Sequence, residues 1–356
     1  MDIRIQQLLS LAVANKASDL HIFARELPRL RVDGELVAVN SFTLEEPAKM
    51  EEMILTLMSP EQLERFKRDK ELDYSVKTDE ARFRVNTYYQ KGEVTTALRV
   101  VTSKIPTFTE LNLPDTFQSF VGLKQGFILL TGPTGHGKST TVASILNEIN
   151  MTRQCHIVTI EDPVEYLITP EKSLVSQREV GYDTPSFSSA LRTCLRQDPN
   201  VVFVGEMRDL DTIQSAITIA ETGHLVFSTL HTNSAAQSID RMVDVFPEGA
   251  KEQIKTQLSS VITAVISQRL MPGINGGRVP GFEIMMATPA IKNAIREGKS
   301  FMIDNIIQTS ADLGMVGMET SLAMLVHKGI VAEDVAYEYA LRPTEFQNKL
   351  RSIKTL

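Results

Sequence analysis

The sequence predicts an α/β protein in which a parallel-rich sheet covered by helices forms the larger domain, behind a small α+β domain. Short, continuously apolar runs alternate with longer segments of helical periodicity after residue 115, as in strands buried on both faces. A glycine-rich loop directly follows the first of these runs. Residues 1–100 instead alternate apolar and polar side chains around tight-turn dipeptides, which is typical of hairpins with one solvated face.

The bulk properties of the chain exclude several classes of protein. With 356 residues the chain exceeds one ordinary hydrophobic core, and its 42% apolar and 23% charged residues are those of a globular protein. The formal net charge of −7 argues against direct binding of nucleic acid. Neither a transmembrane run nor a signal peptide is recognisable, so we expect a cytoplasmic location. Cys155 and Cys194 form no CxxC pair, and reduced core thiols are expected.

Residues 1–100 are expected to form the small α+β domain. Apolar residues at helical spacing between positions 5 and 13 predict a first helix, which a short strand at Asp19–Phe23 follows. Asp33-Gly34 tolerates the positive φ angles of a tight turn, which predicts a hairpin within Leu30–Val37. Two further strands are predicted at Arg82–Tyr88 and Thr95–Val101, with a turn at Lys91-Gly92.

The remainder of the chain divides at its prolines and at its last apolar runs. Pro106 and Pro114 mark residues 101–114 as a linker, because proline removes a backbone donor and discourages regular structure. Apolar residues between Ile254 and Leu270 fall on one helical stripe. Residues 286–356 are expected to form a helical C-terminal region. Within 115–285, parallel strands are predicted at Phe127–Leu130, His156–Ile160, Val201–Val204 and Leu225–Thr229.

The first predicted parallel strand leads into a loop with the spacing of a phosphate-binding motif and then into a helical pattern. Glycines let the loop curl so that successive N–H groups point at phosphate oxygens, in front of a helix N-terminus. Lys138 is expected to reach the β- and γ-phosphates of ATP, and the Ser139 hydroxyl to hold Mg²⁺. The residues expected to contact the nucleotide are Gly132, Pro133, Thr134, Gly135, His136, Gly137, Lys138, Ser139 and Thr140.

Carboxylates follow two other predicted strands, and the carboxyl ends of parallel strands meet at the edge of the sheet where such a loop lies. Glu206 comes soon after the strand at residues 201–204 and is predicted to support Mg²⁺ directly or through water. Glu161, Asp162 and Glu165 follow the strand at residues 156–160. One of these three is expected to orient or deprotonate the attacking water, and the residues alone leave the choice open.

Two histidines bracket the last predicted parallel strand. His224 and His231 are seven positions apart without a third ligand nearby, which makes a poor metal site. His231 stands at the carboxyl end of the strand and is a candidate for sensing the γ-phosphate. A purely structural histidine is an equal alternative.

Four motifs in the same order resemble the signatures of the secretion and pilus-motor ATPase family, and within it the ATPases of type IV pilus retraction and twitching motility. The motifs are Ser18–His21, Ile160–Tyr166, Val204–Asp209 and Thr222–Thr232. The resemblance spans nearly the whole chain. It implies a PAS-like N-terminal domain joined to a RecA-like ATPase domain, assembled as a homo-hexamer with nucleotide sites between the two domains.

The resemblance also implies roles for individual residues. Glu165 matches the glutamate taken as the general base, and Glu206 matches the residue that attends Mg²⁺. Arg82 and Arg84 match N-terminal arginines that swing onto the nucleotide phosphates, where a guanidinium stabilises transition-state charge. Without the resemblance they are interpreted as strand-surface arginines. His136 replaces a serine more usual in the family, and we expect no disturbance because the backbone makes the phosphate contacts.

The function implied by the resemblance is that of a hexameric ATP-hydrolysing motor for pilus retraction and twitching motility. Its expected partners are the inner-membrane pilus platform protein, the pilus base and a second retraction ATPase, at the cytoplasmic face of the inner membrane. Ala290–Glu297 resembles an element associated with retraction, but Lys292 and Ala294 depart from it, so an accessory retraction paralogue is one alternative. An ATPase of a related secretion or DNA-uptake system and a regulatory nucleotide-binding module are others.

Overall fold

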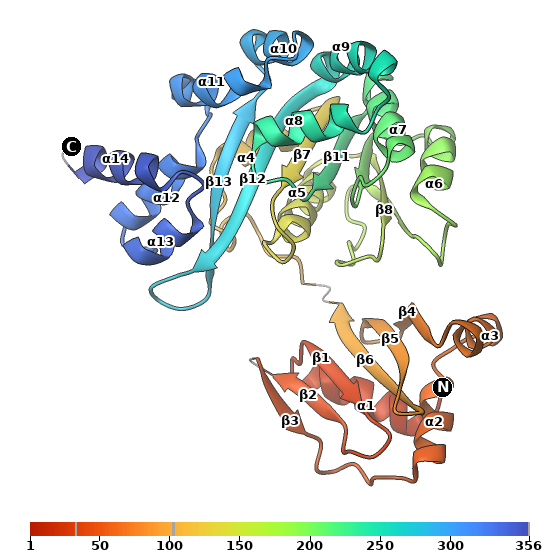
Figure 1. Ribbon diagram of the computed structural model, residues 1–356. Helices are drawn as coiled ribbons and strands as arrows, with labels where there is room; N and C mark the ends of the chain where they lie inside the picture. The colour runs from red at the N-terminus through yellow and green to blue at the C-terminus, as the bar shows by residue number, and fades with distance from the viewer. Residues whose placement is uncertain (33, 102–103, 355–356) are drawn as a thin grey trace. The chain divides into compact units, whose positions relative to one another are not determined.

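The computed structural model describes residues 1–32, 34–101 and 104–354, and the chain divides into two compact units (Figure 1). The first unit contains Met1–Lys104 together with Pro163–Leu167, and the second contains Ile105–Asp162 together with Ile168–Leu356. Asp33 of the predicted hairpin turn and residues 102–103 of the predicted linker lie outside the described residues.

The first unit is a six-stranded antiparallel sheet in the order β3-β2-β1-β6-β5-β4, accompanied by three helices. The predicted first helix, first strand and both hairpins are present, and Lys91 and Gly92 both have positive φ in the β5–β6 turn, as expected. β4 was not predicted, although its apolar residues alternate with polar and charged ones. The elements are α1 (Ile3–Ala14), β1 (Asp19–Ile22), β2 (Arg29–Val32), β3 (Glu35–Ala38), α2 (Pro47–Leu55), α3 (Pro60–Asp69), β4 (Glu71–Lys77), β5 (Arg82–Gln90) and β6 (Glu93–Val101).

The second unit contains a seven-stranded sheet in the order β13-β12-β7-β11-β10-β8-β9, in which only β13 is antiparallel to its neighbour. The four predicted parallel strands are confirmed, and each consists almost entirely of buried residues. The elements are α4 (Thr116–Val121), β7 (Gly126–Thr131), α5 (Lys138–Thr152), β8 (His156–Glu161), β9 (Leu174–Glu179), α6 (Phe187–Cys194), η1 (Leu195–Gln197), β10 (Val201–Val204), α7 (Leu210–Glu221), β11 (Leu225–Leu230), α8 (Ala235–Asp244), η2 (Glu248–Ala250), α9 (Lys251–Val261), β12 (Ile262–Pro272) and β13 (Arg278–Met286).

The predicted helical stripe from Ile254 to Leu270 is wrong over its second half. The helix α9 ends at Val261, and the chain continues as the strand β12, which pairs with β7 on one side and with β13 on the other. Because β12 is buried on both faces, its apolar residues stand at consecutive positions and also satisfy a helical pattern. Its β-branched residues favour a strand, but the helical spacing of the apolar residues led to the prediction of a helix.

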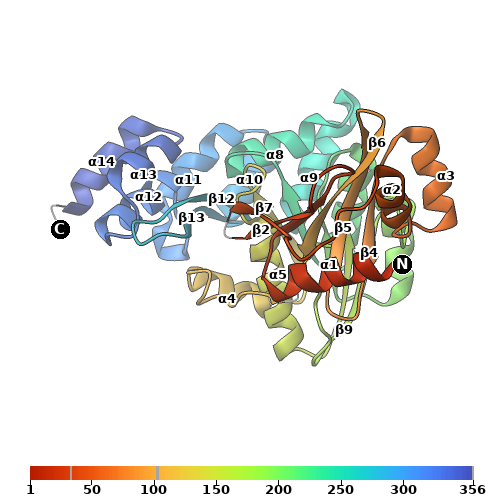
Figure 2. The same ribbon diagram turned by 90° about the horizontal axis from the view of Figure 1, so that it is seen from below.

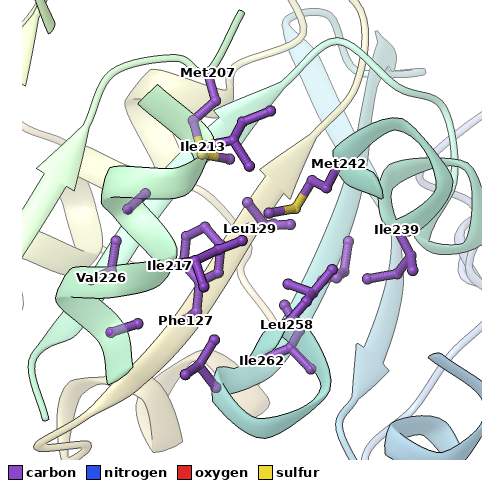
Figure 3. Packing of buried hydrophobic residues seen from close by; sticks show 14 of the residues in the cluster. Phe127, Leu129, Met207, Ile213, Ile217, Val226, Ile239, Met242, Leu258 and Ile262 are labelled. Carbon is purple, nitrogen blue, oxygen red and sulfur yellow. The ribbon is translucent and has the colours of Figure 1, made fainter. Parts of the chain in front are cut away.

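Helices cover both faces of the seven-stranded sheet. Figure 3 shows Phe127 and Leu129 of β7 facing residues of α7, α8 and α9, among them Ile217, Met242 and Leu258. The intervening β7 residues face the opposite side, where α4 and α5 pack, because successive strand residues alternate between faces. Apolar residues of the predicted linker segment also pack on that side, namely Ile105, Phe108 and Leu113.

The helical C-terminal region is confirmed. Its helices α12 and α13 lie beside the long β12–β13 hairpin (Figure 2). There Met271 joins an apolar cluster with Met318 and Leu322. Within the described residues no helix is both long and apolar enough to cross a bilayer. Both cysteines are free thiols. The elements are α10 (Pro289–Arg296), η3 (Ser300–Met302), α11 (Ile303–Thr309), η4 (Ala311–Leu313), α12 (Met318–His327), α13 (Glu333–Tyr339) and α14 (Pro343–Lys354).

The central strand β11 offers a test of how the second unit is stabilised. Phe227 is fully buried in the cluster on the α5 side of the sheet, whereas Phe301 is 76% exposed. Phe227→Ala should lower the free energy of unfolding by about 3–5 kcal/mol, because it leaves a cavity in a packed core. Phe301→Ala should change it by less than about 0.5 kcal/mol. Urea unfolding of both variants checks this, and equal effects would contradict the described packing.

Candidate active site

The glycine-rich loop joins β7 to α5 and lies against β12. Gly132 and Gly137 have φ angles of 139° and 81°, a region that favours glycine. A Cβ atom at Gly132 would lie 2.3 Å from the carbonyl oxygen of Gln268, and one at Gly137 would lie 2.8 Å from the Gln268 Nε2. Gly132 is therefore required by its positive φ and by the nearby backbone of β12, and Gly137 is required chiefly by its positive φ.

The helix α5 begins directly after the loop, without a side-chain cap at Gly137. By contrast, the N-cap side chains of α6, α7 and α8 each accept a backbone N–H of their own helix. An uncapped N-terminus presents N–H groups and a partial positive charge, which suits an anion. This is the arrangement that the sequence predicts for phosphate binding.

Lys138, the first residue of α5, folds back over the loop. Its side chain donates hydrogen bonds to the carbonyl oxygens of Gly132 at 2.7 Å and Pro133 at 2.9 Å, and the residue is only 7% exposed. These two hydrogen bonds place the ammonium group inside the loop, where a phosphate would enter.

Glu206 and His231 meet beside the loop because β10 and β11 are paired in parallel. The Nε2 atom of His231 lies 3.3 Å from the Glu206 carboxylate, and its Nδ1 atom lies 3.3 Å from the Thr134 hydroxyl. A carboxylate only accepts, so Nε2 donates to Glu206, and in the neutral ring Nδ1 then accepts from the Thr134 hydroxyl. Glu206 also forms an ion pair with Arg208. A hydrogen-bonded chain thus runs from the glycine-rich loop to the predicted metal carboxylate.

The three carboxylates after β8 differ in their surroundings. Glu161 is 7% exposed and accepts hydrogen bonds from Thr159 at 2.6 Å and from Gln177 at 3.3 Å. Asp162 and Glu165 are exposed. A carboxylate enclosed by the sheet has poor access to water, so its surroundings favour a structural role for Glu161.

Three predicted site residues belong to the first unit rather than to the second. Glu165 lies within Pro163–Leu167, which groups with that unit. Arg82 and Arg84 lie on the same face of β5, and Arg82 donates a hydrogen bond to Ser75 at 2.8 Å. The structure therefore brings together the glycine-rich loop, Glu206 and His231, and the roles of Glu165, Arg82 and Arg84 stay predictions. His224 bonds locally to the Ile219 carbonyl, in keeping with a structural residue.

β12 supplies contacts to the site that the sequence did not predict. Gln268 donates to the carbonyl oxygen of His136 at 2.9 Å, and the Leu270 N–H donates to the Nδ1 atom of His136 at 3.0 Å. Arg269 donates to the Asn233 side chain at 3.3 Å and to the Tyr339 carbonyl at 2.9 Å. These contacts were not predicted because the segment that forms β12 was expected to be helical. Its β-branched residues are the sequence signal that favours a strand.

The side chain of His136 is held in its neutral form. Burial lowers its pKa below the usual value of 6.5, as do the positive charges of Arg269, Lys138 and Arg278. The ring also contacts that of Tyr339, with centroids 6.2 Å apart. The Nδ1 atom accepts a backbone N–H, a role that protonation would abolish.

This pKa shift predicts a pH-dependent contribution to stability. Because the folded pKa of His136 is lowered, the contribution is complete above the unfolded value of 6.5 and is lost as the pH falls below it. His136→Ser should remove this component, so the two proteins should differ in unfolding midpoint at about pH 7.5 and converge toward about pH 5.5. Thermal unfolding across that range measures it, and parallel curves would contradict it.

The chain has close relatives among known proteins. It is 45% identical over 343 residues to the Type IV pilus retractation ATPase PilT of Pseudomonas aeruginosa, covering 96% of this chain and 99% of that protein. It is 35% identical to the Type IV pilus ATPase PilU of the same organism, covering 97% of this chain and 90% of that protein.

A solved structure shares the fold of the chain. The crystal structure of the pilus retraction motor PilT with bound ADP superposes with a TM-score of 0.91 at 42% identity, covering 98% of this chain and all of that one. The expected α/β architecture, with its N-terminal α+β domain, is therefore confirmed. The family model described as Type II/IV secretion system protein matches residues 1–304. The chain belongs to the Type II/IV secretion system protein family.

Proposed function

We propose that this protein is a Mg²⁺-dependent ATPase that acts as a hexameric ring and drives type IV pilus retraction. The observation that carries the proposal is a phosphate loop with Lys138 folded into it, in a chain 45% identical to a retraction ATPase over 96% of its length. The lower identity of 35% to PilU favours the main retraction motor over an accessory paralogue. The similar solved motor holds ADP, in agreement with a nucleotide site.

Residues 132–140 bind the phosphates in this proposal, and Ser139 and Glu206 hold the metal. Both offer oxygen atoms, which Mg²⁺ prefers. When bound, Mg²⁺ would neutralise charge on the β- and γ-phosphates. The side chain of Glu206 is 14% exposed, so it is accessible while still confined by its partners.

His231 reports the state of the γ-phosphate to Glu206. The support for this role is its position between the Thr134 hydroxyl and the Glu206 carboxylate, with both contacts at 3.3 Å. A phosphate that takes over the Thr134 hydroxyl would free the Nδ1 atom. The orientation of the ring, and with it the carboxylate that it contacts, would then depend on whether the γ-phosphate is present.

Glu165 is the general base, and Arg82 and Arg84 stabilise the charge that develops on the phosphates. The enclosed position of Glu161 supports the choice of an exposed carboxylate, and the family resemblance selects Glu165. In the proposed cycle residues 1–100 form a moving domain, 101–114 its linker, 115–285 the ATPase core and 286–356 the C-terminal region. ATP binding favours a state in which the moving domain is closed onto the ATPase core, and hydrolysis with product release favours an open state. The difference in nucleotide affinity between the closed and open states supplies the work.

The ring delivers this work at the cytoplasmic face of the inner membrane. Its proposed partners are the pilus platform protein, the pilus base and a second retraction ATPase.

Two substitutions test the proposed site. Lys138→Ala should abolish ATP binding and turnover because the loop loses its only ammonium group, while Glu165→Gln should keep binding and lower turnover by about 10²–10⁴-fold. Phosphate release and binding of a fluorescent ATP analogue measure the two effects. Glu252→Gln is the matched control, since the Glu252 side chain is 89% exposed. Full activity in both test variants would reject the site.

A cellular experiment tests the direction of the motor. Deleting the gene should give cells with surplus pili and no twitching, because extension continues without retraction. Complementation with the Glu252→Gln variant should restore motility, and the Lys138→Ala variant should not. Cells without pili would instead indicate an extension motor, and a normal pilus number with normal motility would exclude a role in the pilus.

A further inference from the structure

Gln268 on β12 lies against the phosphate loop and is only 2% exposed. Its side-chain oxygen accepts a hydrogen bond from the Thr141 hydroxyl at 2.8 Å, and its side-chain nitrogen donates to the His136 carbonyl at 2.9 Å. Both bonds have the usual length of a well-formed hydrogen bond, and Thr141 is itself 2% exposed. One buried amide therefore joins the loop to the helix that follows it.

Gln268 also lies close to both ends of the loop. The ideal Cβ position at Gly132 is 2.3 Å from the Gln268 carbonyl oxygen, and that at Gly137 is 2.8 Å from its side-chain nitrogen. Gly132 opens the loop and Gly137 closes it. The backbone of Gln268 therefore lies close to the first glycine of the loop and its side chain lies close to the last, while its two side-chain hydrogen bonds reach His136 and the first turn of α5.

We propose that Gln268 is a positioning residue that holds the phosphate loop in its curved form before nucleotide binds. The inference rests on the proposed function of the loop and extends it to a buried residue of the neighbouring strand. A loop already shaped for its ligand loses less conformational entropy on binding. Without Gln268 the loop would relax, and ATP would have to order it again.

A purely structural role makes a different prediction. A buried amide that only supports the fold would lower stability when removed and leave the affinity for ATP unchanged. Asn150 provides the comparison, because it lies near the other end of α5 and is fully buried. It too donates one hydrogen bond, to the Thr169 carbonyl at 2.8 Å, and accepts one, from the Glu171 N–H at 3.0 Å.

The experiment compares Gln268→Ala with Asn150→Ala in the full-length protein, using steady-state ATP turnover and thermal unfolding. We expect Gln268→Ala to raise the KM for ATP by about tenfold or more and to change kcat by less than about threefold, because saturating ATP reshapes the loop. Asn150→Ala should lower the unfolding midpoint to a similar extent and leave KM within about twofold. An equal change of KM in both variants would overturn the inference.

Thr141 gives a second, milder test that does not require Gln268→Ala to fold. Thr141→Val keeps the shape of the side chain and removes its hydroxyl, which leaves the Gln268 oxygen unsatisfied. It should raise KM by about three- to tenfold, and Thr141→Ser should restore the original value because the hydroxyl returns. An unchanged KM in Thr141→Val would overturn the inference.

The two proposals fail in distinguishable ways. Normal turnover in Lys138→Ala would reject the site itself, whatever Gln268 does. Loss of turnover in Lys138→Ala together with a normal KM in Gln268→Ala would keep the site and reject the positioning role alone.

Discussion

The close approach of the glycine-rich loop to β12 is the constraint on which the rest of the site depends. Gly132 can follow β7 at this point only because nothing replaces its hydrogen atom opposite the Gln268 carbonyl. That approach fixes where the loop begins, and the start of α5 and the position of Lys138 follow from it. Since β12 is paired on both edges, its position is set by the sheet and not by the loop.

The sequence predicted the parts of the site that lie in one continuous pattern. The loop has a fixed spacing, and Glu206 and His231 follow apolar runs whose ends meet in any parallel sheet. β12 escaped prediction for a physical reason: Ile262–Ile266 is buried on both faces, and consecutive apolar residues fit a strand and a helix equally well. The contacts of Gln268 depend on which strand lies beside β7. The residues around Gln268 in the sequence do not indicate which strand will be its neighbour in the sheet.

The ambiguity among the carboxylates after β8 has a similar origin. Glu161, Asp162 and Glu165 lie within five consecutive residues, so the sequence gives no reason to prefer one of them as the group that activates water. Burial separates Glu161 from the other two, because Thr159 and Gln177 hold its carboxylate inside the sheet. The distinction arises from the pairing of β8 with β9, a strand that was not predicted. Tertiary contacts thus leave Asp162 and Glu165 as candidates for the group that activates water, a choice that the sequence alone leaves open among three residues.

The contacts of Arg269 connect the C-terminal helices to the strand that lies beside the glycine-rich loop. Its guanidinium spans from Asn233, two residues beyond His231, to the main chain of Tyr339, and Met271 on the same strand is covered by Met318 and Leu322. A chain truncated at residue 286 would retain every catalytic motif, but it would expose the apolar strand end at Met271 and remove one of the two hydrogen-bond acceptors of Arg269. The C-terminal helices therefore cover part of the sheet that carries the glycine-rich loop.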